Sequence, residues 1–192
     1  MQLILASASP RRQELLKLIG LPFVVRVADI DETMDFSRPA YDEVARVSRL
    51  KALAVERENS EDVVIAADTI VVCEGRVLGK PRTEAEAVEM LTLLSGRDHQ
   101  VMTGCTLRRG NRVETFTEIT DLHFRPLTER EIARYVASGE PMDKAGAYGI
   151  QGGAALFCSH MAGDYYNVMG LPLCTLVQKL AQAVPEWMEV IL

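Results

Sequence analysis

Hydrophobic positions in the first half of the chain alternate between strand-like runs and helical spacing. Residues 3–6 form a short apolar run that predicts a buried strand, and apolar positions three and four apart predict a helix over residues 11–19. The apolar, β-branched stretch at residues 22–30 predicts a second strand, and the pattern across residues 41–56 predicts a second helix. Residues 63–79 then predict a central strand that continues into a hairpin.

The second half of the chain begins with a helix and then changes to paired strands. Thr83, followed by a glutamate at the third position after it, predicts a capping box and a helix N-terminus. Alternating apolar positions predict two paired strands at residues 99–107 and 113–124, and a second capping box at Thr128 predicts a helix to about residue 138. Strands that first alternate with helices and then pair as hairpins indicate an α/β fold with a mixed sheet.

The last third of the chain is less regular. Residues 139–153 form a glycine-rich loop, a short hairpin is predicted around Gly163, and a final helix is predicted over residues 168–183. The chain shows no internal repeat, low-complexity tract or linker. Residues 1–192 are therefore expected to form a single domain.

Two arginines stand where a helix disfavours positive charge. Ser9 and Pro10 predict an N-cap followed by proline at the first helical position, which places Arg11 and Arg12 in the first turn. Because the helix dipole is positive at that end, each cation costs roughly 0.3–1 kcal/mol. A bound anion would offset that cost, so the pair predicts a local anion site.

Composition and charge narrow the class of protein. The formal net charge is −6 and no basic stripe is evident, which disfavours a nucleic-acid partner. The chain has no apolar run long enough to cross a bilayer and no signal-peptide pattern at its start, so we expect a cytoplasmic protein without a membrane partner. The four cysteines lie far apart and the histidines form no HExxH motif, which favours buried free thiols over a zinc site.

An acidic side chain interrupts the most apolar strand. Asp68 lies in VVIAADTIVV, where a carboxylate is costly unless it is paired or faces a pocket. It fits a strand bulge that caps neighbouring backbone, or a general base or metal ligand. Lys51, Lys80 and Lys144 each fit a surface lysine, but the glycine and proline that flank Lys80 would present its side chain at a set angle.

Two loops supply further candidates. Asp29, Asp31 and Glu32 fit either a solvated loop or oxygen ligands for Mg²⁺ or Mn²⁺. Residues 139–153 fit either a plain connection or a phosphate cradle, and the Gln151 amide suits a nucleobase edge or a turn. The cationic and acidic candidates together suit a polyphosphate with a divalent metal, and a triphosphate would be the anion at the first helix.

Seven segments carry a resemblance to a known family, and they follow the family's order over nearly the whole chain. The segments are LASASPRRQELL, DIDE, VARVSRLKALAV, AADTIVVCEGRVLGKP, LSGRDHQVMTG, EPMDKAGAYGIQG and GDYYNVMGLP. On these segments the chain resembles the Maf family of septum-formation inhibitor-like nucleotide pyrophosphatases. The resemblance implies an inosine-triphosphatase-like α/β fold, with an elongated mixed β-sheet flanked by helices and two lobes with a central cleft.

The same resemblance implies an activity. It implies an enzyme that hydrolyses nucleoside triphosphates to the monophosphate and pyrophosphate with a divalent metal, Mg²⁺ or Mn²⁺, and ADT and MDKAGAYGIQG are similar to the branch that acts on dTTP and UTP. Two alternatives stay open: the same chemistry on methylated GTP or ITP, and a non-catalytic nucleotide-binding regulator of cell division. A homodimer is expected from the family alone.

The resemblance further implies roles for individual side chains. Asp68 is the expected proton acceptor, and substrate discrimination is expected from Arg11, Thr69 and Gln151. The other positions that match the lining of the family's pocket are Ser7, Arg12, Glu32, Lys51 and Lys80. We expect in-line attack of water on the α-phosphorus, with Asp68 and Glu32 holding the metal. The cations expected to stabilise the charge that moves onto pyrophosphate are Arg12, Lys51 and Lys80.

Overall fold

The computed structural model describes residues 1–27, 29–35 and 37–191, and the chain divides into two compact units. Unit 1 consists of Met1–Asp68, Thr103–Glu118 and Gly170–Leu192, and unit 2 consists of Thr69–Met102 and Ile119–Met169. The chain passes from one unit to the other four times. Three passages lie within β3 (Val63–Cys73), β5 (Asp98–Arg109) and β6 (Arg112–Phe124), and the fourth lies between Met169 and Gly170. Two units agree with the two lobes expected from the sequence; the cleft expected between them stays a prediction.

Unit 1 combines two short parallel strands with three helices. Its further elements are β1 (Leu3–Leu5), α1 (Pro10–Lys17), β2 (Phe23–Val25), α2 (Ala40–Ala54), α6 (Leu173–Ala183) and the 3₁₀ turn η4 (Pro185–Trp187). The predicted strand and the first two helices are confirmed to within two residues at each end. Strand β2 is shorter than the predicted residues 22–30, and residue 28 of that stretch lies outside the described residues.

Unit 2 holds the remaining elements. They are β4 (Arg76–Leu78), α3 (Glu84–Leu94), α4 (Glu129–Val136), η1 (Glu140–Asp143), η2 (Ala145–Ala147), η3 (Gly153–Leu156), β7 (Cys158–Ala162) and α5 (Tyr165–Met169). Helix α3 packs against α4. Among the described residues of the whole chain, no helix is both long and apolar enough to span a membrane.

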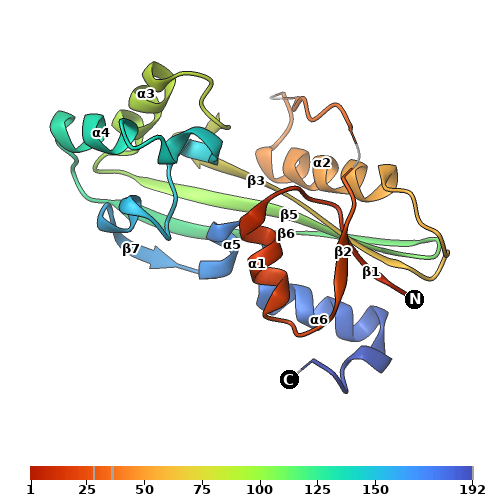
Figure 1. The fold of residues 1–192 in the computed structure, drawn as a ribbon. Coiled ribbons are helices and arrows are strands. Elements are labelled where there is room, and N and C mark those ends of the chain that lie inside the picture. Colours follow the sequence, from red (N-terminus) through yellow and green to blue (C-terminus); the bar gives the residue numbers. More distant parts are fainter. Residues whose placement is uncertain (28, 36, 192) are drawn as a thin grey trace. The chain divides into compact units, whose positions relative to one another are not determined.

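The strands form a mixed seven-stranded sheet (Figure 1). Its order is β2-β1-β3-β5-β6-β7, with β4 paired to β3. Strand β1 is parallel to both neighbours, so that Leu3 lies opposite Phe23 on one side and Val63 on the other. Strands β3 and β4 pair antiparallel, as do β6 and β7. Parallel strands joined through helices, together with antiparallel hairpins, confirm the predicted α/β fold.

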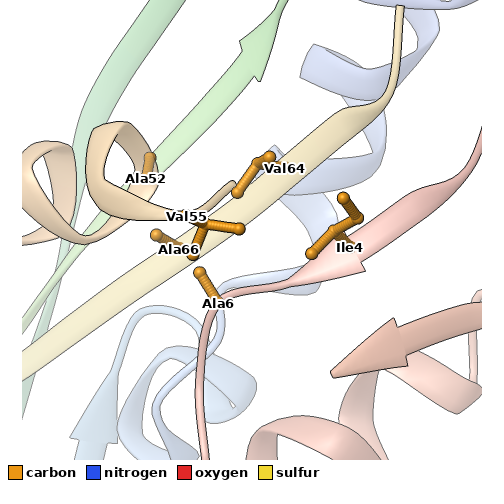
Figure 2. Packing of buried hydrophobic residues seen from close by; sticks show 6 residues of the cluster. All are labelled: Ile4, Ala6, Ala52, Val55, Val64 and Ala66. Carbon is orange, nitrogen blue, oxygen red and sulfur yellow. The ribbon is translucent and has the colours of Figure 1, made fainter. Parts of the chain in front are cut away.

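A cluster of small and branched side chains joins helix α2 to the strands of unit 1. Figure 2 shows Ala52 of α2 and Val55, which follows it, close to side chains of β1 and β3. The other members are Ile4 of β1, Ala6 just after it, and Val64 and Ala66 of β3. Because three of the six are alanines, the helix can lie close to the strands, and burial of about 25 cal/mol per Å² of apolar surface stabilises that contact.

A glycine in β5 lets α2 approach even more closely. A Cβ added to Gly104 would lie 2.4 Å from the backbone oxygen of Val44 and 2.8 Å from the backbone nitrogen of Ala45. Only a residue without a side chain fits there, because the obstacle is backbone that cannot rotate away. The position of α2, and of every side chain on it, therefore depends on Gly104.

Two predicted elements near the C-terminus are wrong. The hairpin expected around Gly163 does not form: β7 ends at Ala162 and pairs with β6 instead, and Asp164 then begins helix α5 by accepting a hydrogen bond from the Tyr166 N–H at 2.7 Å. The final helix begins at Leu173 rather than at residue 168, because Gly170 has a φ of 110° that no helix accommodates.

Two local predictions are partly corrected. Thr128 forms the complete capping box with Glu131, as expected. At Thr83 only half of the box forms, since the Glu86 carboxylate accepts from the Arg82 N–H instead of from the N-cap itself. All four cysteines are free thiols, but only Cys73 and Cys105 are buried; Cys158 is half-buried and Cys174 is exposed.

Candidate active site

Lys51 lies between two carboxylates in unit 1. Its Nζ donates to Asp68 Oδ1 at 2.7 Å and to Glu32 Oε2 at 2.8 Å. The side chains of Lys51 and Asp68 are each 14% exposed, whereas that of Glu32 is 58% exposed. Neither half-buried partner fits the simpler interpretations: Lys51 is not a surface lysine, and β3 continues on both sides of Asp68. The arrangement is a half-buried ion pair that opens toward solvent at Glu32.

The hydrophobic cluster of unit 1 explains why this ion pair forms. Side chains alternate along a strand, so Val64, Ala66 and Asp68 share one face of β3. Val64 and Ala66 pack with Ala52 of α2, as Figure 2 shows. Lys51 directly precedes Ala52 on that helix. The apolar contact therefore holds Lys51 within reach of the carboxylate that continues the same row.

The N-terminus of α1 presents its second arginine through directed hydrogen bonds. Ser9 is the N-cap, and its Oγ accepts from the Arg12 N–H at 3.5 Å. The Arg12 guanidinium donates from Nε to the Gly170 carbonyl at 2.8 Å and from Nη1 to Ser7 Oγ at 3.2 Å. Two bonds from one planar group fix its orientation. Ser7 is buried. Arg11, which precedes Arg12 in the first turn of α1, is half-buried.

Arg12 and Asp68 belong to one electrostatic environment. Loss of surrounding water lowers the pKa of Arg12, and the negative charge of Asp68 is the largest influence that opposes this shift. The nearby charge of Glu32 acts in the same direction, with a smaller effect. Arginine stays protonated in proteins, so the site keeps a desolvated positive charge next to its carboxylates. Ser7, Arg12, Glu32, Lys51 and Asp68 are thus brought together within unit 1.

The loop that carries Glu32 is tied to α2 by a charged pair that sequence reasoning missed. Buried Glu43 accepts from the Arg46 guanidinium at 2.8 Å and from the Asp35 N–H at 2.8 Å. Arg46 also donates to the carbonyl of Thr33, the residue after Glu32, at 2.8 Å. The hydrogen bond from Arg46 holds the pKa of Glu43 below its usual range. Glu43 and Arg46 are three positions apart on one helix, a spacing that predicts an ion pair between them. That spacing does not indicate which loop the ion pair would bind.

Glu32 and Asp68 fit a divalent metal that relies on its substrate for further ligands. Both carboxylates already face one positive charge, the Lys51 ammonium. Mg²⁺ is typically held by one or two protein carboxylates together with phosphate oxygens and water. Within residues 1–27, 29–35 and 37–191, no group of three or more acidic, histidine or cysteine side chains gathers at one point. Glu32 and Asp68 are the side chains that could hold such an ion, with phosphate oxygens and water as its other ligands.

The sequence matches a known protein family over nearly its whole length. A family model described as Maf-like protein matches residues 2–183. The chain belongs to the Maf family.

Its relatives and one solved structure support both the family and the fold. A dTTP/UTP pyrophosphatase of Bacillus cereus strain AH820 is 51% identical over 181 residues, which are 94% of this chain and 95% of that protein. A dTTP/UTP pyrophosphatase of Bacillus thuringiensis subsp. konkukian strain 97-27 is also 51% identical with the same coverage. The structure of a HAM1 protein from Coxiella burnetii matches with a TM-score of 0.51 over 95% of this chain and 99% of that one, at 15% identity, which shows a shared fold.

Three of the residues singled out in the Maf sequence belong to unit 2. Thr69 directly follows Asp68 in β3 and is half-buried. Lys80 is exposed just after β4, where the preceding residue, Gly79, accepts a hydrogen bond from the Gly146 N–H at 3.0 Å. Gln151 is exposed between η2 and η3. The bond to Gly146 ties the Lys80 segment to the glycine-rich loop. The set angle expected for the Lys80 side chain stays a prediction.

Two other candidates have local structural roles in the described part of the Maf chain. Lys144 donates to the carbonyl of Glu140 and to Asp143 Oδ1, both at 2.6 Å. Asp31 accepts from the Thr33 N–H at 2.9 Å, and its hydrogen bonds with Thr33 lower its pKa. These contacts shape loops, and they account for both residues without substrate.

Proposed function

We propose that this chain hydrolyses dTTP and UTP to the nucleoside monophosphate and pyrophosphate. The observation that carries the proposal is the half-buried contact between Lys51 and Asp68, with the desolvated guanidinium of Arg12 in the same unit. Relatives at about half identity over nearly the full length, named dTTP/UTP pyrophosphatases, support the choice of substrate.

The proposed reaction is in-line attack of water on the α-phosphorus. Lys51 contacts Oδ1 of Asp68, and we assign the second carboxylate oxygen to the attacking water, whose proton it accepts. Arg12 and Lys51 stabilise the negative charge that moves onto the pyrophosphate leaving group, and we assign the same task to Lys80. A divalent metal held by Glu32 and Asp68 would neutralise phosphate oxygens when bound.

Four further side chains are assigned to substrate binding. Ser7 Oγ accepts from the guanidinium of Arg12 at 3.2 Å, and we assign Ser7 to orienting that group for a phosphate. Arg11, Thr69 and Gln151 are assigned to discrimination of the base, because a buried polar edge that meets the wrong base leaves hydrogen-bonding groups unpaired. The homodimer implied by the resemblance and the cytoplasmic location expected from the sequence both stay predictions.

A panel of triphosphates tests this function. Pyrophosphate release is measured for dTTP, UTP, CTP, 7-methyl-GTP and ITP with Mg²⁺, Mn²⁺ or Co²⁺. The proposal expects the highest kcat/KM for dTTP and UTP. Preference for 7-methyl-GTP or ITP would replace the substrate, and tight dTTP binding without cleavage under any metal would instead favour a nucleotide-binding regulator.

A further inference from the structure

Gln151 lies at the tip of a tight turn in unit 2. The Gly152 N–H donates to the Gly149 carbonyl at 3.0 Å, which closes a four-residue turn with Gln151 as its third residue. Ile150 is buried and anchors the turn, whereas Gln151 is exposed. The amide of Gln151 is therefore presented outward from a short and closed piece of backbone.

Two side chains from outside the turn hold both of its ends. The hydroxyl of Tyr135, in the last turn of α4, accepts from the Gly149 N–H at 3.0 Å and donates to Glu140 Oε1 at 2.9 Å. The other oxygen of Glu140 accepts from the Gly153 N–H at 3.1 Å. The hydrogen-bonded pair of Tyr135 and Glu140 thus binds the backbone N–H groups of Gly149 and Gly153, on either side of Gln151.

The glycines of the turn are fitted to this pair. A Cβ on Gly152 would lie 2.0 Å from Glu140 Oε1, and one on Gly149 would lie 3.0 Å from the same oxygen. The ring of Tyr135 packs edge-on against Phe157, with centroids 5.2 Å apart, and is largely buried. Burial raises the pKa of Tyr135, so its hydroxyl keeps the proton that it donates. Directed hydrogen bonds to Tyr135 and Glu140, together with the close packing of their side chains, therefore restrain the turn.

We propose that Tyr135 and Glu140 are positioning residues for base recognition, which act by fixing the turn that carries Gln151. The inference rests on the proposed function, in which Gln151 contacts the base. Uracil and thymine present an imide N–H between two carbonyls, whereas cytosine presents an acceptor nitrogen beside an amino group. An amide on a mobile turn can adapt to either pattern, but an amide on a fixed turn selects one of them.

The test combines a conservative variant with a mutant cycle. Tyr135→Phe keeps the ring and removes the hydroxyl, and Glu140→Gln keeps only one acceptor oxygen. We expect Tyr135→Phe to lower the ratio of kcat/KM for UTP to kcat/KM for CTP by about tenfold, within the roughly 10²-fold that a 1 Å misplacement can cost. Saturating kcat for UTP should change less than about threefold, since the reacting groups belong to Asp68 and its neighbours.

Combination with Gln151→Ala shows whether the effect passes through that residue. In the Gln151→Ala background, Tyr135→Phe should change the UTP/CTP ratio less than about twofold, because the positioned amide is already gone. Additive losses would overturn the inference. Tyr41→Phe, which removes an exposed hydroxyl in unit 1, is the matched control and should leave the ratio unchanged.

Hydrogen exchange provides a readout that does not depend on activity. The amides of Gly149 and Gly153 should exchange at least about tenfold faster in Tyr135→Phe and Glu140→Gln, respectively, while exchange in the strands stays the same. Unchanged exchange at these amides overturns the positioning role even if catalysis is altered. A wild-type protein that cleaves neither dTTP nor UTP refutes the proposed function and removes the base-recognition part of the inference, while faster exchange would still support the clamp on the turn.

Discussion

The ammonium of Lys51 lies 2.7 Å from Asp68 Oδ1, where helix α2 passes over strand β3. Both side chains are mostly buried, and the exposed carboxylate of Glu32 contacts the same ammonium. A buried ion pair is weak evidence for stability, because desolvation offsets much of the Coulombic attraction. Its placement beside Arg12 is better explained as a preorganised charge arrangement for a polyanionic substrate and its leaving group.

Loss of the carboxylate at position 68 should abolish most of the activity. Asp68→Asn keeps the shape of the side chain but removes the proton acceptor, so kcat for pyrophosphate release from dTTP should fall at least about 10²-fold. Asp42→Asn, at an exposed position in the first turn of α2, is the matched control and should retain wild-type kcat. A fully active Asp68→Asn protein would refute the assignment of the base.

Arginine is required at position 12 for its geometry as well as for its charge. Lysine cannot donate at once to the Gly170 carbonyl and to Ser7 Oγ in the fixed directions of a guanidinium. Arg12→Lys should therefore lower kcat/KM for dTTP by at least about tenfold, measured in parallel with Arg112→Lys, a replacement at an exposed ion pair. Equal kcat/KM for wild type and Arg12→Lys would show that charge alone suffices.

A single methyl group on β5 should displace α2. Gly104→Ala places a Cβ against the backbone of Val44 and should lower the free energy of unfolding by about 1–3 kcal/mol, the usual cost of overpacking. The measurement is urea denaturation. Gly79→Ala is the control, because no atom lies within 4 Å of its added Cβ, and it should change stability by less than about 1 kcal/mol. Comparable stability of the two variants would contradict the close approach of α2.

Stability should fall in mild acid because of one buried histidine. His99 is buried and bonds to the Tyr148 hydroxyl at 2.9 Å, and burial is the main cause that lowers its pKa from 6.5 to about 4. Between these pH values the unfolded chain binds a proton that the folded chain excludes. His99 therefore does not change the free energy of unfolding above about pH 6.5, and it lowers that free energy by up to about 3 kcal/mol by pH 4.

Urea denaturation at a series of pH values measures this effect. His99→Gln should flatten the slope of stability against pH between 6.5 and 4, whereas His160→Gln, on exposed β7, should leave the wild-type slope. An identical slope in wild type and His99→Gln would mean that other groups cause the acid sensitivity.

Local signals in the sequence were enough for most of the fold. The period of the apolar residues predicted β3, α2 and the hairpin after Cys73, and the Ser9-Pro10 pair predicted the start of α1. The wrong hairpin at Gly163 shows the limit of such signals: glycine marked a turn, while the Asp164 cap marked a helix start that we overlooked.

The sequence predicted which kinds of residue form the candidate site, but it did not predict which of them contact one another. A carboxylate inside an apolar strand identified Asp68 because such a group is costly without a partner. The partner is Lys51, 17 positions away, and a single sequence does not encode which cation that will be. The clash at Gly104 also depends on a helix about sixty positions earlier, although a glycine within an apolar strand was a signal for a close backbone approach.

Hydrolysis of dTTP in ¹⁸O-labelled water tests the central claim most directly, because it reports both the products and the phosphorus atom that water attacks. The account predicts that the wild-type enzyme forms dTMP with the label in its phosphate and releases unlabelled pyrophosphate. Label in pyrophosphate, or release of inorganic phosphate in its place, would contradict attack at the α-phosphorus.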